Sequence, residues 1–526
     1  MEGAAGDAGG GRRRAAAAEA HASEASPTMR ETSRSRGLGA GGDSGPGGTS
    51  GDAGTSARGL DESEGETLLP PTLRPAQLPR GPAWGMVLNM ALYMATPMSM
   101  PATMKASGWG WGTFLIAYGG VATFHSGLLL GDIVGTLPHL HTYPDLGEHF
   151  GRQLGLRLRG ARSPAGAQRW GAAGRRLCLV LQFMAYYLDA TAQLLYVVQY
   201  LDQLNIPWEG RMCLSDWYAW VFLASLPLQL VPNMAEARWV AVPIGAALFL
   251  TVATFFAEVL GGAPWACEPG PSFPRPGAPS IFLSLSAWAY SYGGHGMFVE
   301  IMHELREPEK QWKRCLTWTY GLVVPVHAAC AFLGYAAYGA YAQANVNLNF
   351  PNNAVNRLSI VMQLCLCYYL AFFTNLSTLY GQVEGGLGVD RGVSGPRAAV
   401  WRFLIRAAFL GSQVVLGRLL LVNEGDVLLG LQSLSGAIGM TWFTYIAPFA
   451  FHWMLQEGKG LGGPMRVWYS MNILFGALTM LGGLASSSTD LLDAMGGGLG
   501  RSCNINYRYS PSSPLDPCHL SGYPEG

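Results

Sequence analysis

Charged residues are scarce in this chain: only 13% of its 526 residues are Asp, Glu, Lys or Arg, and the formal net charge is zero. A soluble globular domain carries about 25% charged residues, so the composition argues against a soluble protein. The absence of a basic stripe outside the loops argues against a nucleic-acid partner. The nine cysteines show no paired metal-ligand spacing. We therefore expect no zinc or other metal site and no cofactor.

Apolar residues make up 49% of the chain and recur in long runs between about Pro82 and Ser488. A helix rises about 1.5 Å per residue, so roughly twenty residues cross the hydrocarbon core of a bilayer. The sequence therefore predicts an all-α membrane protein with about eleven transmembrane helices in a lipid bilayer. The predicted segments, numbered in chain order, cover residues 84–106, 109–135, 176–203, 216–233, 238–260, 281–303, 314–340, 357–384, 399–421, 426–455 and 465–487.

Composition divides the chain into three parts. Residues 1–80 are rich in Gly, Ala, Ser and Arg, and they are too poor in aromatic and β-branched residues to bury a core. We expect a disordered cytosolic N-terminal tail at 1–80, a polytopic transporter domain at 82–488 and an extracytosolic C-terminal tail at 489–526. Two alternatives remain for a targeting signal in the N-terminal tail. One is a transit peptide, which the acidic residues of the tail argue against, and the other is an acidic dileucine pattern at 64–69.

The basic residues predict the orientation, because cytosolic loops of membrane proteins collect Lys and Arg. The loops after segments 2 and 6, which lie on one side, hold Arg152, Arg157, Arg159, Arg162, Arg169, Arg175, Arg176, Arg306, Lys310, Lys313 and Arg314. The opposite side holds little beyond Lys105, Arg211, Arg275, Arg357 and Arg418. We therefore place the N-terminus in the cytosol and the C-terminus across a plasma, vacuolar or endosomal membrane.

This orientation puts four cysteines on the oxidising side, if the membrane borders the exterior or a secretory lumen. They are Cys213, Cys267, Cys503 and Cys518. We expect some of these to form disulfides; the alternative is unpaired thiols in loops.

Two of the predicted segments carry signals that interrupt a helix. Segment 1 has Pro97 and Pro101, and each proline removes a hydrogen bond and disfavours helix before its ring, so the helix should open near residues 96–101. Segment 6 contains Gly293-Gly294-His295 and should open near residues 292–296. Irregular backbone at membrane depth is tolerated only where it is buried in protein or lines a cavity. The two interruptions therefore indicate a binding site.

The interrupted segments are five crossings apart. Transporters built from inverted repeats carry their broken helices at corresponding positions of the two halves, with the site between them. Eleven segments therefore fit an inverted five-plus-five repeat with broken helices 1 and 6, plus one extra C-terminal helix. The alternative is that proline kinks and glycine contacts are ordinary features of membrane helices.

The expected ligand is a small acid or an amino acid. Half-helix N-termini expose N–H groups and carry partial positive charge, so a carboxylate would bind well at the breaks. Aromatic and methionine side chains beside them would form an apolar wall, although simple packing is the alternative for each. The expected substrate-binding residues are Thr96, Met98, Ser99, Met100, Tyr290, Tyr292, Gly293, Gly294 and His295.

Ionisable residues inside the membrane are costly and are candidates for function. Asp189 in segment 3 shares one helical face with Gln182, Tyr186 and Gln193, and this polar stripe must face the protein interior. We expect Asp189 and His295 to take part in proton coupling. The alternatives are a hydrogen-bonded Asp that ties helices together and a structural histidine.

The remaining intramembrane polar residues receive less specific predictions. His125 in segment 2 and His327 in segment 7 are expected to be packing residues. Segment 8 offers hydroxyl and amide oxygens to a sodium ion, or to hydrogen bonds between helices. These oxygens belong to Thr374, Asn375, Ser377 and Thr378.

Residues 292–308, which read YGGHGMFVEIMHELREP, resemble the amino acid/auxin permease family, particularly the auxin influx carriers and the plant amino acid permeases. Further resemblance lies at Pro101 with Gly108-Trp109, residues 142–151, residues 334–339, and Leu379-Tyr380 with Glu384. It spans most of residues 82–488. Residues 96–101 and Asp189 depart from the family pattern.

The resemblance implies eleven helices on the broken-helix five-plus-five fold, a cytosolic N-terminus and proton-driven import of amino acids or related carboxylates. By position, His295 would be the substrate-proximal histidine of the family. We therefore expect a proton-coupled symporter of amino acids or small carboxylates, with protons as co-substrate. The alternatives are an auxin-like carrier of aromatic acids and a non-transporting amino acid receptor. An enzyme, such as an acyltransferase using His295, is not expected, because no partner acid is evident.

Overall fold

The computed structural model describes ten stretches of the chain. They are residues 82–94, 96–158, 164–204, 212–231, 240–262, 271–351, 353–389, 395–420, 427–456 and 460–495. Every element in these stretches is a helix, as the sequence predicts. The predicted tail at 1–80 and most of the predicted tail at 489–526 lie outside the described residues.

The helices are written α, with η for short 3-10 and π helices. The first half contains α1 (Ala83–Met94), η4 (Pro97–Ser99), α2 (Met100–Thr136), α3 (Tyr143–Leu158), α4 (Pro164–Leu204), α5 (Leu214–Ser225), η6 (Pro227–Leu230) and α7 (Ala241–Gly262). The second half contains α8 (Ala278–Ser291), η9 (His295–Met297), α9 (Phe298–His303), α10 (Pro308–Tyr338), η10 (Gly339–Tyr341), η11 (Val346–Leu348), α11 (Ala354–Thr374), η12 (Asn375–Leu379), α12 (Tyr380–Gly386), α13 (Pro396–Leu420), α14 (Val427–Ser435), η13 (Gly436–Met440), η14 (Trp442–Ile446), α15 (Ala447–Leu455) and α16 (Gly463–Met495).

Seven of the described helical stretches are long and apolar enough to cross a membrane. An eighth is added if residues 427–440 and 442–455, which are bent by 40°, form one span. Each of the eleven predicted segments coincides with at least one helix, but several of these helices are short or broken. Eleven crossings therefore remain a prediction.

Both predicted interruptions are present. α1 ends at Met94, and the 3-10 turn η4 begins with Pro97 before α2 resumes at Met100. Similarly, α8 ends at Ser291, and Gly293 and Gly294 have no helical assignment before η9 and α9 follow. The sequence located both breaks because proline and paired glycines act on the local backbone, whatever lies around them.

Segments 1 and 2 meet at Gly108, which has a φ of 67° inside the stretch assigned to α2. A side chain at this position would be strained by the left-handed backbone, and its Cβ would lie 3.1 Å from Cδ of Pro276. Only glycine suits this corner. No loop separates the second half of segment 1 from segment 2.

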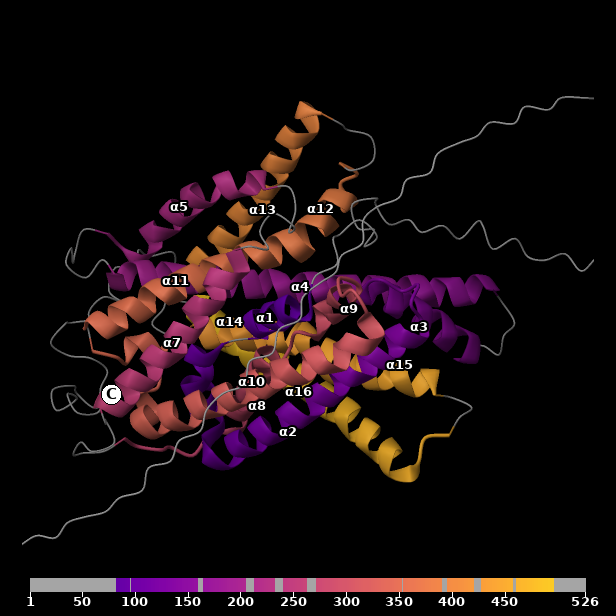
Figure 1. Ribbon diagram of the computed structural model, residues 1–526, viewed down its shortest axis with the longest axis horizontal. Coiled ribbons are helices and arrows are strands. Elements are labelled where there is room, and N and C mark those ends of the chain that lie inside the picture. Colours follow the sequence, from indigo (N-terminus) through magenta and orange to yellow (C-terminus); the bar gives the residue numbers. More distant parts are fainter. Residues whose placement is uncertain are drawn as a thin grey trace, which may run out of the picture. The chain divides into compact units, whose positions relative to one another are not determined.

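The α3 helix was not predicted, since it is too polar for a search based on apolar runs. It packs closely along the first half of α4 (Figure 1). Glycine makes this approach possible: a Cβ on Gly174 would lie 2.2 Å from the carbonyl oxygen of Gly147. Asp145 and Glu148 of α3 also pair with Arg175 of α4, at 2.7 and 3.2 Å.

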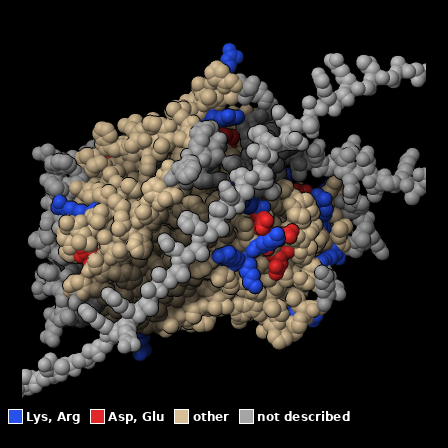
Figure 2. Space-filling model, in the orientation of Figure 1, with Lys and Arg blue, Asp and Glu red and all other residues tan. Residues whose placement is uncertain are grey.

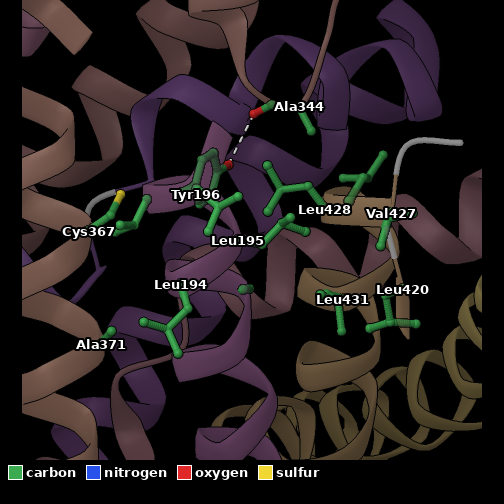
Figure 3. Close-up of a cluster of buried hydrophobic side chains, with 14 of the residues drawn as sticks. Leu194, Leu195, Tyr196, Ala344, Cys367, Ala371, Leu420, Val427, Leu428 and Leu431 are labelled. Atoms are coloured by element: carbon green, nitrogen blue, oxygen red, sulfur yellow. Dashed lines mark hydrogen bonds between the residues drawn. The ribbon is translucent and has the colours of Figure 1, made fainter. Parts of the chain in front are cut away.

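α4 runs through the middle of the helix bundle (Figure 1). It contacts α5, α11 and α13 on one side and α14 with η13 on another. Its apolar residues Leu194, Leu195 and Tyr196 enter a buried cluster that includes Ala371 of α11 and Leu428 of α14 (Figure 3). The Tyr196 hydroxyl donates to the Ala344 carbonyl at 3.1 Å, also drawn in Figure 3. Packing on several sides thus fixes α4 as a central support.

Charged side chains gather at one end of the helices. In Figure 2 blue and red atoms concentrate where Figure 1 labels α3 and α9, and most of the visible face is uncharged. Burial lowers the pKa of His149 on α3, and nearby His139 and Arg152 lower it further, which favours the neutral imidazole there. This charged end corresponds to the side that the sequence predicts to be cytosolic.

Candidate functional site

Asp189 joins three helices at one carboxylate. It lies on α4 with 6% of its surface exposed. Its Oδ1 accepts hydrogen bonds from the Tyr290 hydroxyl of α8 and, at 3.4 Å, from Nε2 of Gln193. Its Oδ2 accepts from the Thr374 hydroxyl of α11 at 3.4 Å. The carboxylate therefore connects segment 3 to segment 8 and to the residues just before the break in segment 6.

The polar stripe of α4 faces the interior, as predicted. Gln182, Tyr186 and Gln193 are all buried. Gln182 donates from Nε2 to the Gly296 carbonyl at 2.8 Å, and Gln193 donates to the Tyr290 hydroxyl at 3.2 Å. The stripe thus follows segment 6 across its break and supplies polar partners for the interrupted backbone.

Aromatic rings surround the Asp189 carboxylate. Tyr93 of α1 packs edge-on against Tyr186, with ring centroids 5.9 Å apart, and both belong with Tyr290 to one cluster. The Tyr93 and Tyr186 hydroxyl groups are buried and lie close enough to interact with each other. The pair places two hydroxyl groups near the Asp189 carboxylate, where a polar group of a ligand could bind them.

The expected substrate-binding residues fall into two groups. Tyr290 packs with Tyr186 beside Asp189. Met98, Met100 and Tyr292 instead pack in another buried cluster, together with residues of α7 and α10. The Ser99 hydroxyl donates to the Thr96 carbonyl within the first break. Tyr290 and Tyr292 therefore lie on different sides of segment 6, and the predicted side chains do not form a single wall.

The second break exposes backbone donors. Among the described residues, no hydrogen bond is recorded for the N–H groups of Gly294, His295 and Gly296, although all three residues are buried. Gly293 donates to the Tyr290 carbonyl and Met297 to the Gly294 carbonyl. The free N–H groups support the predicted affinity of the break for an anionic group.

His295 is fully buried, and both of its ring nitrogens have protein partners. Nε2 lies 2.9 Å from the Ser126 hydroxyl and 2.9 Å from the Thr123 carbonyl of α2. Nδ1 lies 3.3 Å from the Thr444 hydroxyl of η14. This environment is the one expected of a structural histidine. A role of His295 in substrate binding or proton coupling stays a prediction.

His327 of α10 occupies a position that the sequence did not reveal. Its Nε2 accepts the Thr96 N–H of the first break at 3.2 Å, and its ring lies 5.7 Å from the Tyr292 ring at the second break. We expected a packing residue. The signal available in the sequence was only an ionisable side chain inside a span.

The oxygen atoms proposed as sodium ligands do not meet at one point. Thr374 donates to Asp189, whereas the Asn375 amide pairs with Gln413 of α13 at 2.9 Å. Ser377 and Thr378 bond to each other at 3.2 Å. In the described ranges no group of three or more His, Cys, Asp or Glu is arranged to hold a metal ion.

One of the four cysteines expected to form disulfides lies in the described residues. Cys213 is disulfide-bonded, which supports the expectation of disulfides on the predicted oxidising side. Cys267, Cys503 and Cys518 lie outside the described residues. The free cysteines among the described residues are Cys178, Cys315, Cys330, Cys365 and Cys367.

Comparison with known families matches residues 86–489 to the family described as transmembrane amino acid transporter protein. Two curated relatives are the amino acid transporters AVT1E and AVT1B of Arabidopsis thaliana. Identity is 21% over 262 residues for the former, covering 47% of this chain and 44% of the relative. For the latter it is 23% over 266 residues, covering 48% and 43%. The chain thus matches less than half the length of these relatives.

Solved structures show a weaker likeness. A manganese transporter of Eremococcus coleocola aligns with 78% of this chain and 90% of its own, at 14% identity and a TM-score of 0.44. A Na+-coupled sialic acid symporter aligns over the same shares, at 13% identity and a TM-score of 0.37.

Proposed function

We propose that this chain, which belongs to the transmembrane amino acid transporter family, is a proton-coupled symporter of amino acids or related small carboxylates. Family membership makes an enzymatic role the less suitable assignment. The proposal concerns the ion that is coupled to transport, the direction in which ion and substrate move, and the residues that bind them.

The observation that carries the proposal is the environment of Asp189. Its carboxylate is buried and receives three hydrogen bonds, but no Lys, Arg or His of the described residues pairs with it. A buried carboxylate without a cation is costly, so its site favours binding a positive charge. A proton or the ammonium group of an amino acid would supply that charge.

The breaks complete the proposed site. An amino acid is a zwitterion, so a second group is needed for its carboxylate. The free N–H groups of Gly294, His295 and Gly296 carry partial positive charge and can bind the carboxylate. The side chain of the substrate would lie against the aromatic group of Tyr93 and Tyr186. We propose that the residues expected from the sequence contribute to binding from two sides of segment 6 and not as one wall. These residues are Thr96, Met98, Ser99, Met100, Tyr290, Tyr292, Gly293, Gly294 and His295.

Transport then follows the scheme of inverted-repeat carriers. The segments that carry the breaks rock against the rest of the bundle and open the site to one face at a time. α4 is packed on several sides and fits the static part of this scheme. We propose an orientation with the charged α3 and α9 end in the cytosol, in a plasma, vacuolar or endosomal membrane.

The test is uptake of a radiolabelled amino acid panel into proteoliposomes containing the full chain, at two external pH values. We expect an inward proton gradient to stimulate uptake of at least one amino acid. Asp189→Asn should lower that uptake by at least about tenfold, because it removes the buried negative charge that receives the cation. Asp132→Asn on α2, exposed and outside the site, is the control for loss of an Asp charge. No stimulation for any amino acid would refute proton coupling.

An auxin-like carrier of aromatic acids is the second candidate, since three tyrosines lie beside Asp189. Competition separates the two. Indole acids that compete more strongly than neutral amino acids would favour this alternative, and the reverse order would support amino acid transport.

A further inference from the structure

His327 is placed where both broken segments can act on it. It lies on α10 with 1% of its surface exposed, and α10 packs against α1, η4 and α2. The Thr96 N–H of the first break donates to Nε2 of His327 at 3.2 Å. The Tyr292 ring at the second break lies 5.7 Å from the imidazole. One side chain therefore contacts both interruptions, although Thr96 is 231 residues away in the chain.

The direction of the hydrogen bond from Thr96 defines the tautomer of the neutral His327 imidazole. Nε2 accepts an N–H, so it carries a lone pair and no hydrogen, and the hydrogen of the neutral imidazole lies on Nδ1. Nδ1 is buried and has no partner among the described residues. Trp288 Nε1, the Tyr292 hydroxyl and the Thr96 hydroxyl are also buried without partners among the described residues. The Trp288 and Tyr292 rings are stacked, with centroids 5.8 Å apart.

The buried Nδ1–H of His327, which has no acceptor among the described residues, is not explained by packing. Buried polar atoms in proteins nearly always have a protein, water or ligand partner. Trp Nε1 and the Nδ1–H of this tautomer can only donate. The missing partner is therefore an acceptor, such as a carboxylate oxygen or a water molecule.

We propose that His327 binds the coupling proton, and that protonation transfers the Thr96 N–H from the imidazole to the carboxylate of the substrate. An imidazolium has no lone pair, so a proton taken up at Nε2 must break the Thr96 bond. The freed backbone N–H and the new positive charge then both favour a carboxylate at the first break. This inference rests on the proposed proton-coupled function.

Tyr292 is the ionisable group that faces the imidazole. No charged side chain of the described residues interacts with the ring. Lys105 of α2 donates to the Ala342 carbonyl, and Glu300 of α9 accepts from the Tyr143 N–H. Tyr93 of α1 packs on Tyr186, and Glu258 lies on α7. Nothing in the described surroundings replaces the carboxylate as counter-ion of a protonated His327.

The test uses the full chain in proteoliposomes with His327→Gln. The glutamine oxygen can accept the Thr96 N–H, but the amide does not take up a proton near neutral pH. Uptake driven by a pH gradient should fall by about tenfold or more, the size of a typical coupling between two sites. Counterflow exchange of labelled amino acid needs no net proton movement and should persist. His125→Gln is the matched control, because His125 on α2 is bonded to Trp468 away from the breaks.

Each outcome of this experiment either supports or overturns the proposal for His327. A His327→Gln protein with the parental response to the pH gradient overturns the assignment of the proton to His327. If the unmodified protein exchanges amino acids but does not respond to the pH gradient, proton coupling itself is refuted. Measuring the unmodified protein therefore separates failure of the proposed function from failure of the His327 assignment. If the variant does not fold, amino acid binding to the parent in detergent is measured against pH. Affinity should fall as the pH rises and His327 regains the Thr96 bond, and a flat profile refutes the inference.

Discussion

At the scale of single residues, Glu384 shows how a residue noticed in the sequence gains a physical role. It belongs to the family-like pattern of segment 8, which gave no partner for it. In the structure its Oε1 accepts from Nε of Arg406 on α13 at 2.6 Å, and both side chains are 7% exposed. Arg406 also lies 5.1 Å over the Tyr380 ring and donates to the Val231 carbonyl at 2.7 Å. The pair ties α12 and α13 to the end of segment 4.

Arg406→Gln should destabilise the protein by about 3 kcal/mol, because it leaves a buried carboxylate with only Arg402 nearby, at 3.9 Å. Thermal unfolding in detergent measures the change. Lys310→Gln is the control: its pair with Glu307 is 78% and 55% exposed, and its loss should cost no more than about 1 kcal/mol. Equal stability of the two variants would contradict a structural role for the buried pair.

At the scale of elements, local rules located features that depend on a few neighbouring residues. Prolines and glycines marked both breaks, and the spacing of polar residues gave the inward face of α4. The sequence could not show that Tyr290 and Tyr292 lie on different sides of segment 6, since the break alters the helical periodicity. Nor could it show that His327 accepts from Thr96, because that contact depends on how two distant segments pack. α3 was missed because its stability comes from packing on α4 and from ion pairs.

Gly293→Ala tests whether the second break requires glycine. A Cβ at this position would lie 2.5 Å from the Ala289 carbonyl oxygen and 2.9 Å from Met440 Cβ. Relief of this overlap needs backbone movement, so we expect a loss of about 1–3 kcal/mol in stability and a marked loss of uptake. Gly321→Ala on α10 is the control, since a Cβ there meets nothing within 4 Å. Unchanged uptake in Gly293→Ala would mean that the break tolerates a side chain.

At the scale of the whole molecule, apolar composition predicted an all-helical membrane protein, and every element of the described residues is a helix. Charge distribution predicts which end faces the cytosol, and charged side chains do gather near α3 and α9. The orientation itself stays a prediction. The number of crossings depends on how short and broken helices are counted. It also depends on parts of the chain that lie outside the described residues.

Epitope tags at the two ends test the odd number of crossings. An odd number places the ends on opposite sides, so an N-terminal tag should be accessible only from the cytosol and a C-terminal tag only from the other side. Antibody accessibility before and after selective permeabilisation measures both. Two tags on one side would refute the eleven-helix prediction without affecting the breaks.

The left-handed corner at Gly108 joins the half of segment 1 after Pro97 to segment 2 through a single residue. A connection this short leaves the two helices little freedom to separate. In the transport cycle proposed above, a tilt of the half-span beside the substrate is therefore expected to displace segment 2 as well.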